Sequence, residues 1–420
     1  MKRIIIIVAG IGLTVAWCIA SSAAEPPPSA ESQGVPAGPI ELSADDFRFN
    51  GIYGSDGARI ARLATNHFRV TLQAGPGHKN WPNVLQFEIT ANAKGNGLRL
   101  DVVFPGSMEY PFNEYFTGFS YDRKRWTAVP WKRGGRKPAP SDDVLVLPAF
   151  TEDRVFVAHE NGFAHEDLLD RRAMWEKHPD VRAETLGHSL EKRPILRFRI
   201  TKGDAPAPLR DRWCHYLANQ HAEEANAIHR MAGLIDWLLS DEGLDARSRA
   251  VWHLVLLSNP DGPAHGWRRQ NGQGVDMNRS YRESGSDAKA QAHEAYVLQA
   301  DLERLMKGEC PPVTVFSMHA WPGKIETFFC PGPEVGVGVG PWTDLRDTLA
   351  RLGTRGLCKP LAMSVKKGPT TYWTYGPKSQ FGTSAFLVEG GGDLLSQDDN
   401  ALTGEILGRA IGAYYKGLRR

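Results

Sequence analysis

The strongest constraint on the fold is a change in hydrophobic pattern near Arg182. From about Leu42 to His159, short segments of alternating apolar and polar residues are broken by Gly, Pro and Asn clusters, which favours an antiparallel β-sandwich. After Arg182, strand-like runs alternate with helical stretches. That order is typical of an α/β domain with a mixed, mostly buried central sheet covered by helices. We therefore predict a sandwich domain over 42–159 and an α/β domain over 160–420.

Individual elements follow from the period of the apolar residues. In the first half, strands are predicted within Ala61–Gln73, Leu85–Ile89, Leu98–Phe104 and Val144–Phe150. In the second half, strands are predicted at Pro194–Thr201, Trp252–Leu257, Val313–Met318 and Ser384–Val388. Helices are predicted at Ala222–Leu239, Leu345–Leu352 and Leu402–Leu418. The Gly- and Val-rich segment Pro331–Gly340 is predicted to be a mobile loop.

The N-terminus has the pattern of a secretory signal. Lys2 and Arg3 precede an uncharged run, Ile4–Ala20, and small residues then lead into a Pro-rich segment over 25–41. We predict a signal peptide over 1–24 and a periplasmic or secreted protein. An uncleaved membrane anchor is the alternative, although the run is at the short edge of the roughly 20 residues that a span requires.

Charge and cysteine content limit the partners. The chain has 50 Lys plus Arg and 48 Asp plus Glu, so without the two basic leader residues the charges balance at 48 against 48. This excludes a basic field for nucleic acid, and no stable membrane insertion is expected after signal cleavage. Four cysteines remain in the exported chain, which permits up to two disulfides in three possible pairings: Cys214, Cys310, Cys330 and Cys358.

Three residues indicate a metal site. His221 and Glu224 are three residues apart at the start of a predicted helix, so their side chains can converge. His319 follows a predicted buried strand, at the edge of the sheet where open α/β folds build their sites. A capping role for Glu224 and a buried core role for His319 are the alternatives. Two imidazoles and one carboxylate form a catalytic zinc set with a fourth position left for water.

Further motifs lie in a fixed order around these residues. A turn, Asn259–Gly262, follows a buried strand, and Trp267–Arg269 and Gly274–Arg279 come next. Glu389 ends the last predicted strand, before three consecutive glycines. Each of these is common alone, as a turn or a surface charge, but their joint occurrence in this order indicates one site.

Over roughly Arg182–Arg420, the chain resembles a zinc carboxypeptidase of the M14 family, and the sandwich ahead of it is similar to the cytosolic-carboxypeptidase branch. The resemblance rests on the motifs above and on the entry segment Ala183–Ser189 with Arg193. It implies the following roles: His221, Glu224 and His319 as ligands of one Zn²⁺ per chain; Glu389 as general base; Arg268 facing the scissile carbonyl; Asn278 and Arg279 binding the terminal carboxylate of the substrate. Asp276 is either an acceptor for a ligand histidine or a turn residue.

The sequence departs from the digestive enzymes of the family at the mobile tyrosine. Tyr372 and Tyr375 are the nearest candidates to close over a substrate, and Thr370, Thr371 and Tyr372 are candidates for side-chain preference. The resemblance implies hydrolysis at the C-terminus of a peptide or protein. A murein-peptide (γ-D-Glu-diaminopimelate) amidase with the same zinc chemistry is the alternative, and a catalytically silent zinc-binding protein is a third hypothesis. Oligomeric state is left open.

Overall fold

The computed structural model describes residues 40–131, 143–321, 328–331, 335–358 and 369–418. Pro39–Arg420 forms one compact unit. The predicted leader and nearly all of the Pro-rich segment lie outside the described residues, as does the side chain of Cys330, so the signal and the disulfides stay predictions. Among the described residues, no helix is long and apolar enough to cross a membrane.

The first half of the chain folds into two sheets. One has the order β1-β4-β9-β6-β7 and the other β2-β3-β5-β8. The strands are β1 Phe47–Arg48, β2 Arg59–Ala64, β3 His67–Thr71, β4 Phe87–Ile89, β5 Leu98–Val103, β6 Thr117–Ser120, β7 Thr127–Val129, β8 Asp143–Leu147 and β9 Val155–His159, after a short 3-10 helix at Ala44–Asp46. Buried side chains from both sheets, such as Phe68 and Phe87, belong to one hydrophobic cluster.

One strand pair departs from the expected antiparallel arrangement. β3 and β5 run parallel, with His67 opposite Arg99 and Thr71 opposite Val103. Between them the chain leaves this sheet and adds β4 to the other sheet before it returns. Because the connection passes through the other sheet, β5 can run in the same direction as β3. The alternation of apolar and polar residues within one strand does not show in which direction that strand pairs.

The second half contains a seven-stranded mixed sheet, as predicted. Its order is β10-β11-β13-β12-β14-β16-β15, in which β13, β12, β14 and β16 are parallel and the other strands antiparallel. The strands are β10 Val181–His188, β11 Pro194–Ile200, β12 Trp213–Asn219, β13 Ala250–Val255, β14 Thr314–Met318, β15 Phe328–Pro331 and β16 Ser384–Glu389.

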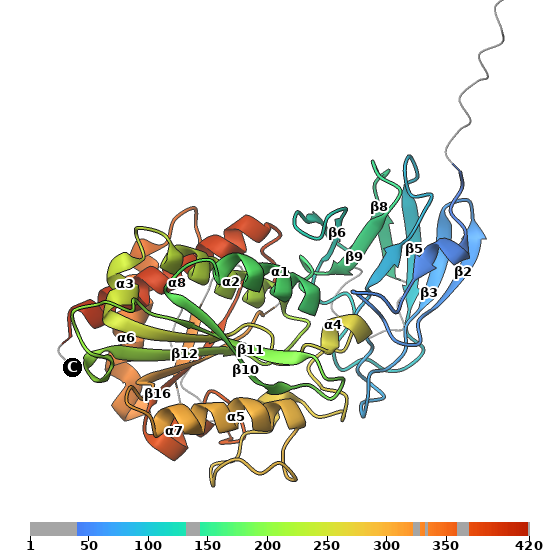
Figure 1. The fold of residues 1–420 in the computed structure, drawn as a ribbon. Helices are drawn as coiled ribbons and strands as arrows, with labels where there is room; N and C mark the ends of the chain where they lie inside the picture. The colour runs from blue at the N-terminus through green and yellow to red at the C-terminus, as the bar shows by residue number, and fades with distance from the viewer. Residues whose placement is uncertain (1–39, 132–142, 322–327, 332–334, 359–368, 419–420) are drawn as a thin grey trace, which may run out of the picture. The chain divides into compact units, whose positions relative to one another are not determined.

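Helices bury both faces of this sheet (Figure 1). The helices of the second half are α1 His165–Trp175, α2 Ala225–Leu239, α3 Leu244–Arg249, α4 Gly262–His265, α5 His293–Met306, α6 Val335–Leu352, α7 Gly376–Phe381 and α8 Gln397–Lys416, with short 3-10 helices at Leu209–Asp211 and Met277–Arg279. Successive residues of β12 face opposite sides. Leu217 joins the core with α2 and α8, while Tyr216 and Ala218 join the core with α5.

Two predicted boundaries were wrong. Helix α6 begins at Val335, so most of the predicted loop over 331–340 is helical. Leu345 and Leu349 of this helix are buried in the main core, and such packing outweighs the weak helix propensity of Gly and Val. Helix α2 begins at Ala225, and Glu224 has the non-helical backbone angles of an N-cap residue. The metal-site candidates before α2 therefore lie in the turn that enters the helix.

The first half of the chain is hydrogen-bonded to the segment that follows β13. The backbone amides of Gly54, Asp56 and Val84 donate to Pro263, His265 and Gly266 at 3.0, 2.9 and 2.9 Å. Farther along, an added Cβ at Gly274 would lie 2.7 Å from the Cα of Gly77, so only glycine fits this close approach. These contacts fix the segment that carries the arginines and Asn278.

We predict that His265 makes folding stability depend on pH. Its ring lies 2.8 Å from Asp56 and 2.6 Å from Glu191. Burial lowers the pKa of His265, but the two carboxylates outweigh burial and raise it. A raised histidine pKa stabilises the fold fully below the unfolded value of about 6.5, and the contribution is lost as pH rises through the folded pKa. Melting temperatures from pH 5.5 to 8.5 should therefore fall more steeply for wild type than for His265→Gln; parallel curves would contradict the assignment.

Candidate active site

Three neighbouring parallel strands bring the candidate residues to one edge of the sheet. Strand β14 pairs with β12 and with β16, so that Met318 lies opposite both Asn219 and Val388. His319 directly follows β14, His221 lies two residues beyond β12, and Glu389 ends β16. Because the carboxyl ends of parallel strands meet at the same edge, side chains far apart in sequence come together there.

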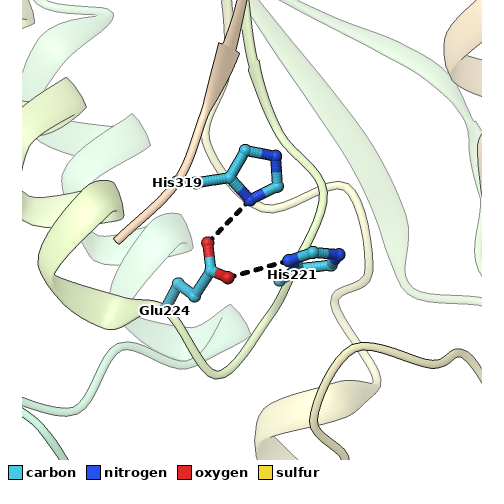
Figure 2. A group of neighbouring side chains, drawn as sticks. All are labelled: His221, Glu224 and His319. Carbon is cyan, nitrogen blue, oxygen red and sulfur yellow. Dashed lines mark hydrogen bonds and ion pairs between the residues drawn. The ribbon is translucent and has the colours of Figure 1, made fainter. Parts of the chain in front are cut away.

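His221, Glu224 and His319 form a compact group, here called the donor triad. Figure 2 shows both imidazole rings turned toward the carboxylate of Glu224, one to each oxygen. His221 Nδ1 lies 2.8 Å from Oε1 of Glu224, and His319 Nδ1 lies 2.8 Å from Oε2. All three side chains are buried, and one donor atom from each lies within 4.8 Å of the others. This is the donor set of a catalytic zinc site.

The second nitrogen of each ring has its own partner. Nε2 of His221 lies 3.0 Å from Asp276, which also accepts from the backbone amide of Asn278 at 2.9 Å. Asp276 thus both contacts His221 and stabilises the turn at Asn278. Nε2 of His319 lies 2.9 Å from Ser317 Oγ. Because these outer contacts orient each ring, both Nδ1 atoms are left to face a metal ion, and the residues fit the ion that the set implies.

Electrostatics favour a cation at the triad. Burial raises the pKa of Glu224, but His319 and His221 outweigh burial and hold it below its usual range. Burial lowers the pKa of His221, but Glu224 and Asp276 raise it to about 9. Since metal-binding imidazoles must be neutral, an ion bound here would displace protons, and metal affinity should rise with pH.

Arg230 forms hydrogen bonds to the backbone next to the triad. This arginine lies on α2 with 0% of its surface exposed. Its guanidinium donates to the carbonyl oxygens of His319 (3.0 Å) and Gly390 and to Thr403 Oγ1 (3.2 Å). One side chain therefore joins the helix after Glu224 to the residues at the ends of β14 and β16. Sequence reasoning missed it, because nothing in the pattern of α2 distinguishes this arginine from a surface charge.

Glu389 lies beside the triad, and one of its carboxylate oxygens accepts no hydrogen bond from the described residues. It lines a cavity of about 240 Å³ together with Glu224 and His319. Its Oε2 is buried and has no hydrogen-bond partner among the residues that the structure describes. Burial, and then the negative charge of Glu224, raises the pKa of Glu389 well above its ordinary value. A carboxyl group with this environment is suited to accept and release a proton.

The two adjacent arginines point to different partners. Arg269 Nε lies 3.0 Å from Asp276, and its Nη1 lies 3.8 Å from Glu224 of the triad. Arg268 instead donates to the carbonyl of Pro111 at 2.8 Å and lies 3.4 Å from Glu114. Both arginines line the cavity, and Arg269 also contacts Glu224 of the triad.

The predicted substrate-binding residues all line the cavity: Asn278, Arg279, Tyr372 and Tyr375. The Asn278 amide lies 3.1 Å from His319 Nε2 and accepts from the backbone of Trp373 at 3.0 Å. The guanidinium of Arg279 lies 3.9 Å above the ring of Tyr372. Thr374 and Leu387 also line the cavity, whereas Thr370 and Thr371 are not among its lining residues.

The first half of the chain supplies part of the cavity wall. Tyr110, Glu114 and Tyr115 are among its lining residues. Tyr110 lies under the guanidinium of Arg269 at 5.3 Å, and the Tyr115 hydroxyl donates to Ala320 O at 3.2 Å. In the sequence, the many aromatic residues between β5 and β6 are the one sign of this cavity wall. Which of them face the cavity depends on tertiary contacts.

Comparison with known families agrees with this geometry. Residues 170–302 match the model of the zinc carboxypeptidases, family M14. The similarity to this family of zinc-dependent peptidases covers this segment, which is less than half of the chain. The matched residues include the first two members of the triad, both arginines, Asn278 and Arg279. His319 and Glu389 lie beyond the matched residues, but the parallel strands β14 and β16 bring them to the same edge.

Solved structures share the fold. The metallo-carboxypeptidase of Burkholderia cenocepacia superposes with a TM-score of 0.72 at 16% identity, over 88% of this chain and 99% of that one. The Pseudomonas aeruginosa metallo-carboxypeptidase, in complex with (2-guanidinoethylmercapto)succinic acid, gives 0.71 at 18% identity, over 89% and 100%. An uncharacterized protein of Zymomonas mobilis is 27% identical over 206 residues, 47% of this chain and 50% of the relative, so the match spans half of that relative's length.

We predict that Arg230→Met destabilises the protein by about 3 kcal/mol, because it leaves buried carbonyl oxygens without their donor. Urea denaturation measures the loss. Arg409→Met is the control, since Arg409 is partly exposed and pairs with Glu242 and Glu405 at the surface. Such surface pairs contribute about 1 kcal/mol or less. Equal effects of the two substitutions would contradict the role of Arg230.

Proposed function

We propose that the protein is a zinc carboxypeptidase that removes C-terminal residues from peptides or proteins. The observation that carries this proposal is one cavity lined by a metal-donor triad member, an uncommitted buried carboxyl group and an arginine suited to a terminal carboxylate: Glu224, Glu389 and Arg279. The match of residues 170–302 to the zinc carboxypeptidases supports the chemistry. The predicted signal sequence supports a periplasmic or secreted site of action.

The triad would hold the zinc ion, and Glu389 would handle the proton. A bound zinc ion supplies a Lewis acid that brings the pKa of water toward neutrality. Glu389 takes the proton of the attacking water at its free Oε2 and later delivers it to the leaving amine. Asp276 and Ser317 hold the two histidine rings in the orientation that this arrangement requires.

Two arginines would orient the substrate. Arg269, fixed by Asp276, places a cation beside the triad, where it stabilises negative charge on the scissile carbonyl oxygen. The sequence resemblance implies this role for Arg268, but the contacts of Arg268 with Pro111 and Glu114 favour Arg269. Arg279 offers the bidentate fork that matches a carboxylate, and Asn278 lies next to it in the cavity wall.

Several uncharged side chains line the cavity, and one of them, Tyr372, lies against Arg279. Tyr372, Thr374 and Leu387 line the cavity together with Tyr375. These side chains suit an uncharged C-terminal residue, with Tyr372 and Tyr375 as the candidates to close over it.

The proposal predicts zinc-dependent release of single C-terminal residues. Zinc-loaded protein incubated with a mixed peptide library should shorten L-peptides from the C-terminus, as read by mass spectrometry, and a strong chelator should stop the reaction. Glu389→Gln should retain zinc but lower kcat by at least about 100-fold, because the amide cannot take the proton. Full activity of metal-free protein would contradict the zinc mechanism. Cleavage of murein stem peptides alone would favour the amidase alternative.

The role of Arg279 predicts that a free C-terminal carboxylate is required. Peptides with an amidated C-terminus should be cleaved far more slowly than the free acids, because burying the guanidinium without its partner is costly. Arg279→Ala should shrink this difference, mainly through kcat/KM. Arg282→Ala is the control, since Arg282 is half-buried outside the cavity lining and donates to the carbonyl of Ala290. Equal cleavage of amide and acid by wild type would remove the proposed role.

A further inference from the structure

One acidic side chain in the cavity has no partner and no place in the proposed mechanism. Glu223 lines the cavity with only 7% of its surface exposed. Its Oε2 is buried and has no hydrogen-bond partner among the described residues. A buried carboxylate without a partner is unfavourable, so a carboxylate aimed into a cavity indicates that a ligand supplies the missing charge or donor.

The neighbouring cations already have acidic partners. Arg268 lies 3.4 Å from Glu114, and Arg269 lies 3.0 Å from Asp276. Glu223 Oε2 accepts from neither arginine and lacks a donor among the described residues, so a cationic group of the substrate would supply the missing hydrogen bond.

Arg279 and Glu223 have different neighbours in the cavity wall. Arg279 lies 4.0 Å from Asp276 and 3.9 Å from the ring of Tyr372. Glu223 interacts electrostatically with Tyr115, whose hydroxyl donates to Ala320 next to His319. If Arg279 binds the terminal carboxylate, a peptide that passes the triad brings its penultimate residue to the Ala320 side, near Glu223.

This side of the cavity also suits a long side chain with a charged end. Ala320 donates its backbone amide to Glu224 at 3.0 Å and accepts the Tyr115 hydroxyl. Trp321, next in the chain, lines the cavity with 52% of its surface exposed. Aromatic rings pack against the aliphatic stems of lysine and arginine and attract their cations.

We propose that Glu223 is a specificity-determining residue that binds the cationic side chain of a penultimate lysine or arginine. The inference rests on the proposed carboxypeptidase function and adds a substrate class to it: peptides with a basic penultimate residue and an uncharged C-terminal residue. In this arrangement Tyr115 and Trp321 contact the aliphatic part of the side chain, and Glu223 accepts hydrogen bonds from its charged end.

The test compares two acetylated peptides that end in Lys-Leu or norleucine-Leu, because norleucine keeps the aliphatic stem and lacks the charge. For the zinc-loaded wild type, kcat/KM should be roughly tenfold higher for the lysine peptide, the scale of a partly desolvated ion pair. Glu223→Gln should remove this preference. Glu109→Gln is the control: it removes the same charge from an exposed residue outside the cavity lining and should keep the preference.

Binding gives a second readout that does not depend on turnover. Calorimetry with zinc-loaded Glu389→Gln should show tighter binding of the lysine peptide, and the double variant with Glu223→Gln should lose the difference. Equal kcat/KM and equal Kd for the two peptides would overturn the inference while leaving the carboxypeptidase proposal intact. A preference that survives Glu223→Gln would overturn the assignment to Glu223. Failure to cleave any peptide would count against the proposed function, and the Kd ratio would still decide the inference.

Discussion

The site depends on the parallel pairing of β12, β14 and β16. This pairing brings the ends of three strands, separated by up to 170 residues, to one edge of the sheet. Arg230 then fixes the edge, because it binds the carbonyls of His319 and Gly390 from a helix that begins directly after Glu224. A buried guanidinium that donates to backbone carbonyls holds the ends of these strands together beside the donor triad.

The first half of the chain contributes to the site as well as to the fold. Its backbone holds the segment after β13 through bonds to Pro263, His265 and Gly266. Its loop between β5 and β6 brings Tyr110 and Tyr115 into the cavity wall. The cavity is therefore composite, and a substrate that enters it contacts side chains from both halves. This arrangement would let the first half select among peptides without taking part in the proton transfers.

The sequence predicted the site best where a polar residue stands at the end of an apolar strand or at the start of a helix. His319 and Glu389 follow or end predicted apolar strands, and His221 and Glu224 are three residues apart at the start of a predicted helix. Reasoning failed where tertiary contacts decide. The start of α2 after Glu224, the helical form of 335–340 and the parallel β3–β5 pair depend on packing between distant segments. The role of Arg268 stays a prediction, and its direction could not be read from the sequence because its contacts, Pro111 and Glu114, lie more than 150 residues earlier.

The central claim is that one zinc ion is held by the donor triad. Anomalous X-ray scattering from crystals of the zinc-loaded protein, recorded on both sides of the zinc absorption edge, tests it most directly. The account predicts one strong peak per chain at about 2.0–2.2 Å from Nδ1 of His221, Nδ1 of His319 and a carboxylate oxygen of Glu224. A zinc peak elsewhere in the chain, or zinc bound through Glu389 in place of Glu224, would contradict it.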